Sequence, residues 1–318
     1  MNEINYSIVI PCYSSNNCLK ELVDRTAGVM KAYEPYELLL VNDKSPDSET
    51  WQTICSLAEN HTFIKGIDLL YNVGQFRATL CGIEYANGKY IITMDDDLQH
   101  PPEELPKLIE AMHQNFNMDC IMGQYINKRH NPVRNAGSWL MKQIMNKLYS
   151  KPADIVTTSF RIMPATFAKS LIQYRIAHPQ LGPLIISLTG KVMNVPTEHD
   201  HRKDGASGYS IMHGIREAFK SVINASIVPL RLFSFLGFVT AGVAFFIGLY
   251  FLIRWFLGGI GVPGFTTLIL AVTFFSGMML AGIGVLGEYI GRIIQELTGM
   301  PKYMVSQTVG DRHESIIK

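Results

Sequence analysis

Cysteine is scarce in this sequence, and its spacing excludes two classes of site. The 318 residues contain 5 cysteines. That number is odd, and the sequence has neither a CxxC pair nor a nearby histidine at zinc spacing, so a disulfide framework and a zinc site are both disfavoured. We expect free thiols in a reducing compartment that faces the cytosol. The cysteines are Cys12, Cys18, Cys55, Cys81 and Cys120.

A charge imbalance and a secretory leader are also lacking. The formal net charge is +1, so overall electrostatics do not favour a nucleic-acid partner, and we expect none. The first residues, MNEINYSIVIP, lack a basic segment followed by an apolar one, so no signal peptide is expected. Charge is uneven locally, because residues 120–153 contain several Lys and Arg but no Asp or Glu.

Charged residues are missing from two long stretches near the C-terminus. Residues 232–253 and 265–287 contain none, and about 20 apolar residues suffice to cross a bilayer. The short segment LGGIGVPG lies between them, which predicts a two-helix hairpin with both termini on one side. Arg231 and Arg292 flank the pair and Arg254 lies in the hairpin, so the positive-inside rule places both termini in the cytosol. Two buried core helices of a soluble protein are the alternative.

Small residues are frequent in both stretches. Gly277 and Ala281 illustrate a spacing of four that lets helix backbones approach closely. We therefore expect a homo-oligomer, with a tetramer as the candidate state. Gly282, Gly284 and Gly287 also match the GxGxxG dinucleotide pattern. Because this match lies inside an apolar helix rather than between a strand and a helix, we reject the cofactor interpretation.

The first 200 residues alternate between short apolar runs and amphipathic stretches. The runs are SIVIP, ELLLVND, residues 64–70 and residues 90–94. Continuous apolar runs suit strands that are buried on both faces of a parallel sheet, and their alternation with helices favours βαβ units. The sequence therefore predicts an α/β domain with a Rossmann-like, mostly parallel sheet. Ligands of such sheets bind beyond the carboxyl ends of the strands.

Three carboxylates, Asp95, Asp96 and Asp97, directly follow the predicted strand YIITM. Their mutual repulsion favours a bound cation, and Mg²⁺ or Mn²⁺ combines carboxylate ligands with substrate phosphates. Alternation along an extended backbone would send Asp95 and Asp97 to one side and Asp96 to the other. The alternative is a solvated turn that caps a helix beginning near Pro102.

Further polar residues lie at strand ends and in loops. Asp43 ends the second predicted strand, where it suits either a nucleotide contact or an Asx turn. Arg161 and the segment HDHRKDGASGY, residues 199–209, supply cations and a flexible loop that can hold a diphosphate. An ordinary solvated loop fits the same letters.

Two basic amphipathic segments, residues 135–149 and 209–229, suit helices that lie at the level of the lipid headgroups. Packing against the core of the domain is the alternative. The predicted order along the chain is a cytosolic domain, an interfacial helix, a transmembrane hairpin and a cytosolic tail. These parts cover residues 1–208, 209–229, 230–292 and 293–318.

Several segments together resemble the polyprenyl-phosphate glycosyltransferases of glycosyltransferase family 2. They are SIVIPCY, LLLVNDKSPD, YNVGQFRATLCGI, ITMDDDLQHPPEELPKLI, SFRIMP and HRKDGASGYS. The resemblance implies a GT-A fold with two C-terminal transmembrane helices. It also implies inverting transfer of a sugar from a nucleotide-sugar, by default a UDP-sugar, to a polyprenyl phosphate such as undecaprenyl phosphate. The reaction would take place at the cytoplasmic face of the inner membrane.

The resemblance also implies roles for individual residues. Asp97 and Asp95 would bind Mg²⁺ or Mn²⁺, and Arg161 would lie near the acceptor phosphate. The implied nucleotide-sugar contacts are Pro11, Tyr13, Asp43, Asp95, Asp96, Ser207 and Tyr209, and the implied catalytic residues are Asp97, Gln99, Arg161 and Arg202. The sequence departs from the family at Asn42, where many members have Asp, at Lys44, where Gly is usual, and at Gly208, where some have Lys.

Two other functions stay open at this point. A processive polysaccharide synthase would carry a QxxRW motif, but the Arg254-Trp255 pair has Phe251 where Gln is required. A non-catalytic membrane scaffold would keep the fold and the nucleotide pocket. Three adjacent carboxylates argue against the scaffold, because a silent relative has no need of them.

Overall fold

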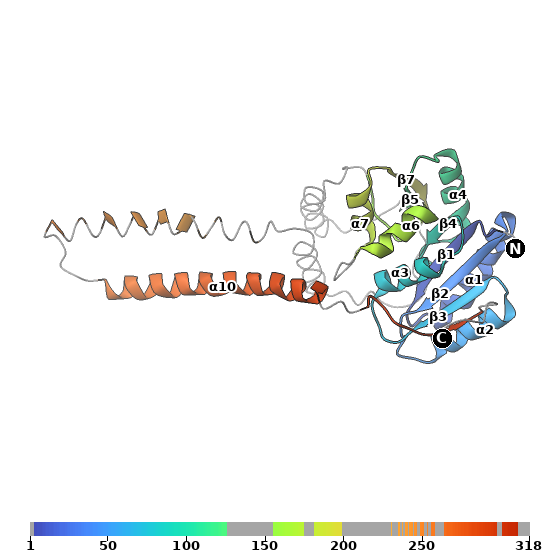
Figure 1. The fold of residues 1–318 in the computed structure, drawn as a ribbon, viewed down its shortest axis with the longest axis horizontal. Helices are drawn as coiled ribbons and strands as arrows, with labels where there is room; N and C mark the ends of the chain where they lie inside the picture. The colour runs from blue at the N-terminus through green and yellow to red at the C-terminus, as the bar shows by residue number, and fades with distance from the viewer. Residues whose placement is uncertain are drawn as a thin grey trace. The chain divides into compact units, whose positions relative to one another are not determined.

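The computed structural model describes residues 3–125, 155–174, 181–198, 264–297 and 301–310, with single residues between 230 and 257. The chain divides into two compact units. Unit 1 comprises Met1–Gly208 and Pro301–Lys318, and unit 2 comprises Tyr209–Met300. Figure 1 shows the elements of both.

Unit 1 is built on a mixed sheet with the strand order β7-β5-β6-β4-β1-β2-β3-β8 among the described residues. Strands β4, β1, β2 and β3 are parallel neighbours, as are β5 and β7. Strand β6 runs antiparallel to β4 and β5, and β8 runs antiparallel to β3. The strands are β1 (Tyr6–Cys12), β2 (Tyr36–Asn42), β3 (Ile64–Leu69), β4 (Tyr90–Thr93), β5 (Cys120–Tyr125), β6 (Arg161–Pro164), β7 (Val192–Thr197) and β8 (Val305–Val309).

The central strands are apolar on both faces because helices cover both. Every residue of β1 and β2 is buried. Ile8 and Leu40 belong to one core cluster, whereas the neighbouring Val9 and Val41 belong to the other. The four apolar runs in the sequence correspond to β1, β2, β3 and β4, which confirms the predicted α/β class and the parallel centre of the sheet.

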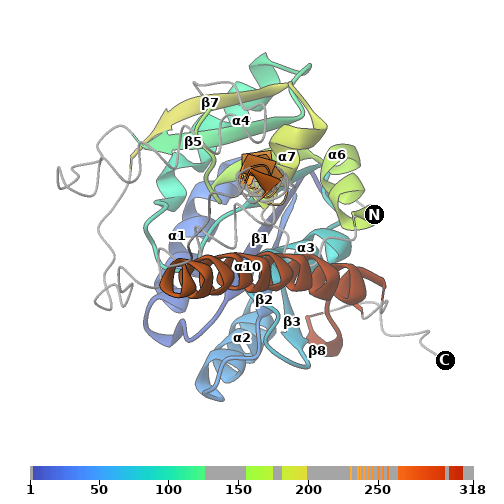
Figure 2. The same cartoon turned by 90° about the vertical axis from the view of Figure 1, so that its left-hand side faces the viewer.

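Helices pack on the two faces of the sheet (Figure 2). Residues of α1, α2 and α4 join the first core cluster, and residues of α3, α6 and α7 join the second. The helices are α1 (Asn16–Met30), η1 (Lys31–Tyr33), α2 (Glu49–Asn60), α3 (Gln75–Tyr85), η2 (Pro102–Glu104), α4 (Leu105–Gln114), α6 (Ala165–Ser170), η3 (Leu171–Gln173) and α7 (Leu181–Leu188).

Strand β8 reaches the sheet from the far end of the chain. It pairs with β3, with Gln307 opposite Asp68. The Leu70 N–H donates to the carbonyl of Met304 at 2.8 Å, just before β8. The sequence pattern predicts only a cytosolic tail over residues 293–318, so this strand is a feature that the pattern does not reveal.

Unit 2 contains the long helix α10 (Phe265–Leu297). Within it, Phe274–Gly291 has a mean hydropathy of 1.4 and no buried residues, and it is the one candidate membrane span among the described residues. Gly282, Gly284 and Gly287 all lie inside this helix, which is the position that the sequence predicts for them. Of the predicted first span, residues 232–253, only single residues are described, and these are helical.

Candidate active site

The carboxyl ends of β1, β2 and β4 carry the polar residues that the sequence singled out. Tyr13 follows β1, Asp43 follows β2 and Asp95 follows β4 closely. Parallel neighbouring strands end at the same edge of a sheet, so these residues share one edge. Pro11 lies within β1 and is buried, whereas Tyr13 is 52% exposed.

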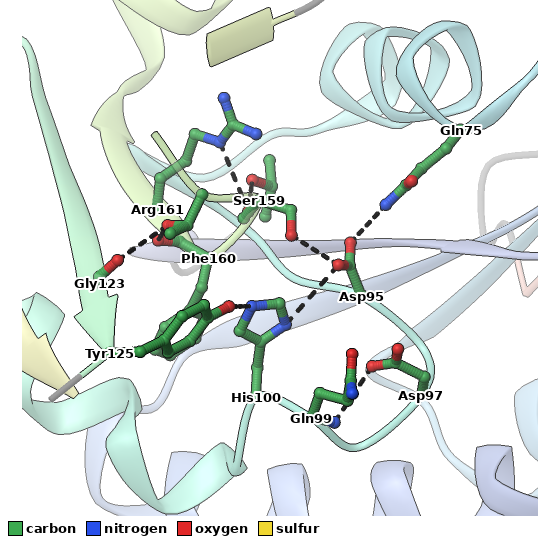
Figure 3. Close-up of polar contacts among 12 residues, drawn as sticks. Gln75, Asp95, Asp97, Gln99, His100, Gly123, Tyr125, Ser159, Phe160 and Arg161 are labelled. Atoms are coloured by element: carbon green, nitrogen blue, oxygen red, sulfur yellow. Dashed lines mark hydrogen bonds and ion pairs between the residues drawn. The ribbon is translucent and has the colours of Figure 1, made fainter. Parts of the chain in front are cut away.

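Asp95 contacts three different parts of the chain (Figure 3). Its Oδ1 accepts a hydrogen bond from Nε2 of Gln75, in the first turn of α3, and its Oδ2 accepts one from Oγ of Ser159 at 2.6 Å. Nδ1 of His100 lies 3.8 Å from Oδ2. Burial raises the pKa of Asp95; the bond from Ser159 opposes this shift and the Asp97 carboxylate adds to it. A bound cation would relieve this unfavourable charge.

Asp96 points to the loop after β1. Its Oδ2 accepts the backbone N–H of Tyr13 at 3.0 Å and the hydroxyl of Ser15. Burial raises the pKa of Asp96 to about 6 despite these two hydrogen bonds. Asp95 and Asp96 therefore have separate partners, as the alternation predicted. Asp96 connects the end of β4 to the loop at residues 13–15.

Asp97 and Gln99 lie in the tight turn after β4. Oδ1 of Asp97 accepts the backbone N–H of Gln99 at 3.1 Å. Leu98, between them, is buried and has a φ of 59°. The helical turns that follow, η2 and α4, have no side-chain cap. The alternative in which the aspartates merely cap a helix is therefore wrong.

Oxygen donors that suit a hard divalent cation are present in this turn. Asp95, Asp97 and Gln99 are all partly exposed. No group of three His, Cys, Asp or Glu side chains that could hold a metal occurs in the described part of the chain. Magnesium is commonly held by one or two carboxylates, with water and substrate phosphates filling the other positions. Two carboxylates and an amide oxygen therefore fit Mg²⁺ or Mn²⁺ without a third acidic ligand.

A histidine–tyrosine pair, of which the histidine is buried, lies behind Asp95 and was not predicted. Nε2 of His100 is hydrogen-bonded to the hydroxyl of Tyr125, at the end of β5. The His100 ring also stacks on Phe160, with 5.3 Å between centroids. Burial raises the pKa of Tyr125, and the charges of Asp95 and Asp97 raise it further. His100 lies in the DDDLQHPPEE segment, but no spacing in the sequence connects it to Tyr125.

Arg161 begins β6, and its side chain is buried. Its Nε donates to the carbonyl of Ser159 at 3.4 Å, and its Nη1 has no hydrogen-bond partner among the described residues. Burial lowers the pKa of Arg161. A pocket of about 390 Å³ lies beside it, lined by Gln75, Phe76, Asp95, Thr157, Thr158, Ser159, Arg161, Gly182 and Pro183. A buried guanidinium with an unused donor favours an anion there.

Asp43 holds the turn before α3. Its two carboxylate oxygens accept the backbone N–H groups of Val73 at 2.7 Å and Gly74 at 2.9 Å, and burial raises its pKa. These bonds take the place of the Asx turn considered for Asp43, and the local side-chain bond in this segment comes from Asn42, whose Oδ1 accepts the N–H of Ser45 at 3.2 Å. Asp43 therefore shapes the edge of the site.

Three predicted site residues lie outside the described residues: Arg202, Ser207 and Tyr209. The two predicted interfacial segments, residues 135–149 and 209–229, lie outside them as well. All five cysteines are described and all are free thiols.

The profile described as "Glycosyl transferase family 2" matches residues 7–171. These residues include β1, β2, β4 and the Asp95–Asp96–Asp97 turn. The chain belongs to glycosyltransferase family 2. The resemblance on which the sequence analysis rested is thereby confirmed.

Curated relatives of this glycosyltransferase match nearly its whole length. An undecaprenyl-phosphate 4-deoxy-4-formamido-L-arabinose transferase from Aeromonas hydrophila subsp. hydrophila is 32% identical over 95% of this chain and 93% of its own. The protein of the same description from Photorhabdus laumondii subsp. laumondii is 30% identical over 96% of this chain and 94% of its own. The match therefore includes the C-terminal segments that lie beyond the family profile.

Solved structures support the fold of the glycosyltransferase. Glucosyl-3-phosphoglycerate synthase from Mycobacterium tuberculosis, in complex with Mn²⁺, UDP and phosphoglyceric acid, is similar with a TM-score of 0.52 and 12% identity. The similarity covers 69% of this chain and 76% of that one. At this identity the likeness shows the α/β GT-A fold alone.

Proposed function

We propose that this glycosyltransferase moves a sugar from a nucleotide-sugar to undecaprenyl phosphate at the cytoplasmic face of the membrane. The observation that carries the proposal is the carboxylate turn after β4, which lies beside the Arg161 pocket in a chain whose relatives are undecaprenyl-phosphate sugar transferases. The carboxylate turn suits a diphosphate donor with its metal ion, and the Arg161 pocket suits a phosphate acceptor. Family resemblance implies inversion at the anomeric carbon by direct displacement.

Asp95, Asp97 and Gln99 would hold a Mg²⁺ or Mn²⁺ ion. When bound, the ion neutralises charge that develops on the departing nucleoside diphosphate. Asp97 would be the principal metal ligand, because both carboxylate oxygens of Asp95 already accept hydrogen bonds, one from Gln75 and one from Ser159. Gln99 stays beside Asp97 through its backbone bond.

The donor nucleotide, by default uridine diphosphate, would bind at the edge formed by Pro11, Tyr13 and Asp43. The exposed Tyr13 ring offers a flat surface for a base. Asp96 fixes the backbone of this loop, and Asp43 fixes the turn that leads into α3. We propose that Arg202, Ser207 and Tyr209 help to bind the diphosphate.

Arg161 would bind the acceptor phosphate in the pocket of about 390 Å³. Its unused Nη1 donor can pair with a phosphate oxygen, and Thr157 and Ser159 line the same pocket. A phosphate monoester is largely ionised near neutral pH, so it needs orientation more than deprotonation. For that reason we assign no general base.

Two membrane spans with a cytosolic catalytic unit complete the proposal. The chain leaves unit 1 after Gly208 and returns to it at Pro301, where β8 joins the sheet. Because unit 1 lies on one side of a membrane, the number of crossings between these two residues must be even. The candidate span in α10 therefore requires a second one, for which residues 232–253 qualify by length. A homo-oligomer, with a tetramer as candidate, stays a prediction.

Replacing the proposed metal ligand tests the assignment. Asp97→Asn should lower transfer about 100-fold or more, because charge stabilisation of the leaving group is lost, while the unfolding temperature without metal changes little. Asp24→Asn, at an exposed carboxylate on α1, is the matched control and should retain activity. Near-normal turnover of Asp97→Asn at saturating donor would contradict the metal assignment.

A further inference from the structure

A row of polar side chains crosses four strands at the edge where the donor is proposed to bind. The strand register places Cys12 of β1 beside Asn42 of β2, Asn42 beside Asp68 of β3, and Asp68 beside Gln307 of β8. Asn42 and Asp68 are each only 3% exposed. Polar groups buried to this extent require hydrogen-bond partners.

Three members of this row, Asn42, Asp68 and Gln307, join Ser45 and Ser14 in a continuous chain of hydrogen bonds. Nε2 of Gln307 donates to Oδ2 of Asp68 at 3.2 Å, and Nδ2 of Asn42 donates to Oδ1 of Asp68 at 2.7 Å. Oδ1 of Asn42 accepts the hydroxyl of Ser45 at 2.7 Å. Oγ of Ser45 then accepts the backbone N–H of Ser14 at 3.1 Å. We call these five residues the relay.

The relay ends on a strained part of the proposed donor loop. Ser14 has a φ of 55°, in the left-handed region that a residue with a Cβ rarely adopts. Such a conformation persists only where the surroundings over-determine it. Ser45 holds Ser14 from one side, and Asp96 holds the adjacent Tyr13 and Ser15 from the other. Tyr13 is thereby fixed where a nucleotide base would meet it.

The other end of the relay lies on the first strand after the candidate membrane helix. Gln307 follows the end of α10, Leu297, by ten residues in sequence (307 − 297 = 10). The Gln307 side chain is exposed, so its bond to the buried Asp68 is the outermost contact of the relay.

We propose that Gln307, Asp68 and Asn42 are positioning residues for the nucleotide-sugar, through which β8 fixes the loop at residues 13–15. The inference rests on the proposed function, because it takes this loop as the donor site. None of the three needs to touch the substrate. In this proposal β8, which follows the candidate membrane helix, helps to shape the donor site from outside it.

An exchange of the two groups in the buried pair separates positioning from simple packing. Asn42→Asp alone sets two carboxylates at a separation of 2.7 Å. Asp68→Asn alone is milder, because the amide at position 68 can still accept from Asn42, and the exposed Gln307 amide can rotate so that its Oε1 accepts from the new NH₂ group. The double variant restores every donor–acceptor match, because the amide introduced at position 68 can donate to the carboxylate introduced at position 42 and still accept from Gln307.

Affinity for UDP in the presence of Mn²⁺, measured on the full-length protein in detergent, is the primary readout. Asn42→Asp should weaken UDP binding about tenfold and Asp68→Asn less, and the double variant should recover to within about threefold of the unchanged protein. The KM for nucleotide-sugar should rise in parallel, with kcat and the KM for lipid acceptor changing less than about twofold. Gln307→Ala should raise the donor KM a few-fold, whereas the control Thr308→Ala, one residue along β8, should not.

Three results would overturn the inference. They are unchanged UDP affinity in Asn42→Asp, a double variant as weak as Asn42→Asp, and a loss confined to kcat. Thermal unfolding of every variant shows whether a loss of binding reflects a loss of folded protein. If the unchanged protein binds no nucleotide with Mn²⁺, then the proposed function itself fails, and the inference fails with it.

Discussion

Three non-glycine residues near the candidate active site have positive φ angles. They are Ser14, Lys44 and Leu98, with φ values of 55°, 50° and 59°. Ser14 follows β1, Lys44 follows β2 and Leu98 lies between Asp97 and Gln99. Strain of this kind concentrates at functional sites. Each residue lies at the carboxyl edge of the sheet, where side chains must turn toward a ligand.

Lys44 offers a direct test of this strain. Its side chain is exposed, so Lys44→Gly removes the left-handed penalty and loses no buried contact. We expect the free energy of unfolding to rise by about 0.5–1 kcal/mol, after the greater chain entropy of glycine is subtracted. Thermal unfolding should show a midpoint roughly 2 °C higher. Lys44→Ala keeps the Cβ and should show no gain; an equal gain in both variants would mean that backbone strain is not the cause.

Asp96 predicts how stability depends on pH in the metal-free protein. Its pKa in the folded protein is about 6, against an ordinary value of 3.8. The folded protein therefore binds a proton that the unfolded chain has already released between these values. The resulting stabilisation is complete below about pH 4 and is lost as pH rises through 6.

The unfolding temperature of the metal-free protein should accordingly fall between pH 4.5 and 7. Asp96→Asn keeps an oxygen for the Tyr13 N–H but cannot ionise, so its curve should be flatter over that range. Added Mn²⁺ should reduce the fall, because a cation offsets the carboxylate charges. Parallel curves for the unchanged protein and Asp96→Asn would contradict the assignment.

The sequence identifies several residues of the candidate site, but it does not reveal all of their contacts. The Asp95–Asp96–Asp97 run was identified because three carboxylates follow a buried strand, and the division between Asp95 and Asp96 follows from strand alternation. Asp43 was found for the same reason, yet its bonds to Val73 and Gly74 depend on a loop 30 residues away. No local pattern encodes such a contact.

At the scale of elements, the sequence predicts those strands that form continuous apolar runs. Strands β1 to β4 are visible as runs of buried residues. Strand β8 reads VSQTV, and its residues are exposed or only partly buried. An edge strand that is half polar does not differ in composition from a loop, and it is stabilised by a partner more than 200 residues away, which explains why it was missed.

Helix α10 can be tested as a membrane element. Ile283 lies near the middle of Phe274–Gly291 and is 57% exposed. Ile283→Lys would place a charge in the hydrocarbon core at a cost of about 3 kcal/mol, so the fraction of protein recovered in carbonate-washed membranes should fall. Phe116 is an exposed aromatic residue of unit 1, and Phe116→Lys is the control that should leave membrane recovery unchanged. Full recovery of Ile283→Lys would contradict the span.

At the scale of the whole molecule, unit 2 is an insertion in unit 1. The sheet of unit 1 is completed only by β8, which the chain reaches after it has passed through unit 2. The catalytic sheet and the candidate membrane segment are therefore linked at both ends of that segment. A lipid acceptor cannot leave the bilayer, so a catalytic domain tethered twice suits such a substrate better than a single flexible tether would.

We propose that this glycosyltransferase transfers a sugar to undecaprenyl phosphate in a metal-dependent reaction. The most direct measurement incubates the full-length protein with undecaprenyl phosphate and a panel of radiolabelled nucleotide-sugars, with Mn²⁺, with Mg²⁺ or with chelator. We predict label in a chloroform-soluble product for at least one donor, only with metal. A folded protein that yields no lipid-linked label from any donor, or yields the same amount with chelator, would contradict metal-dependent transfer to undecaprenyl phosphate.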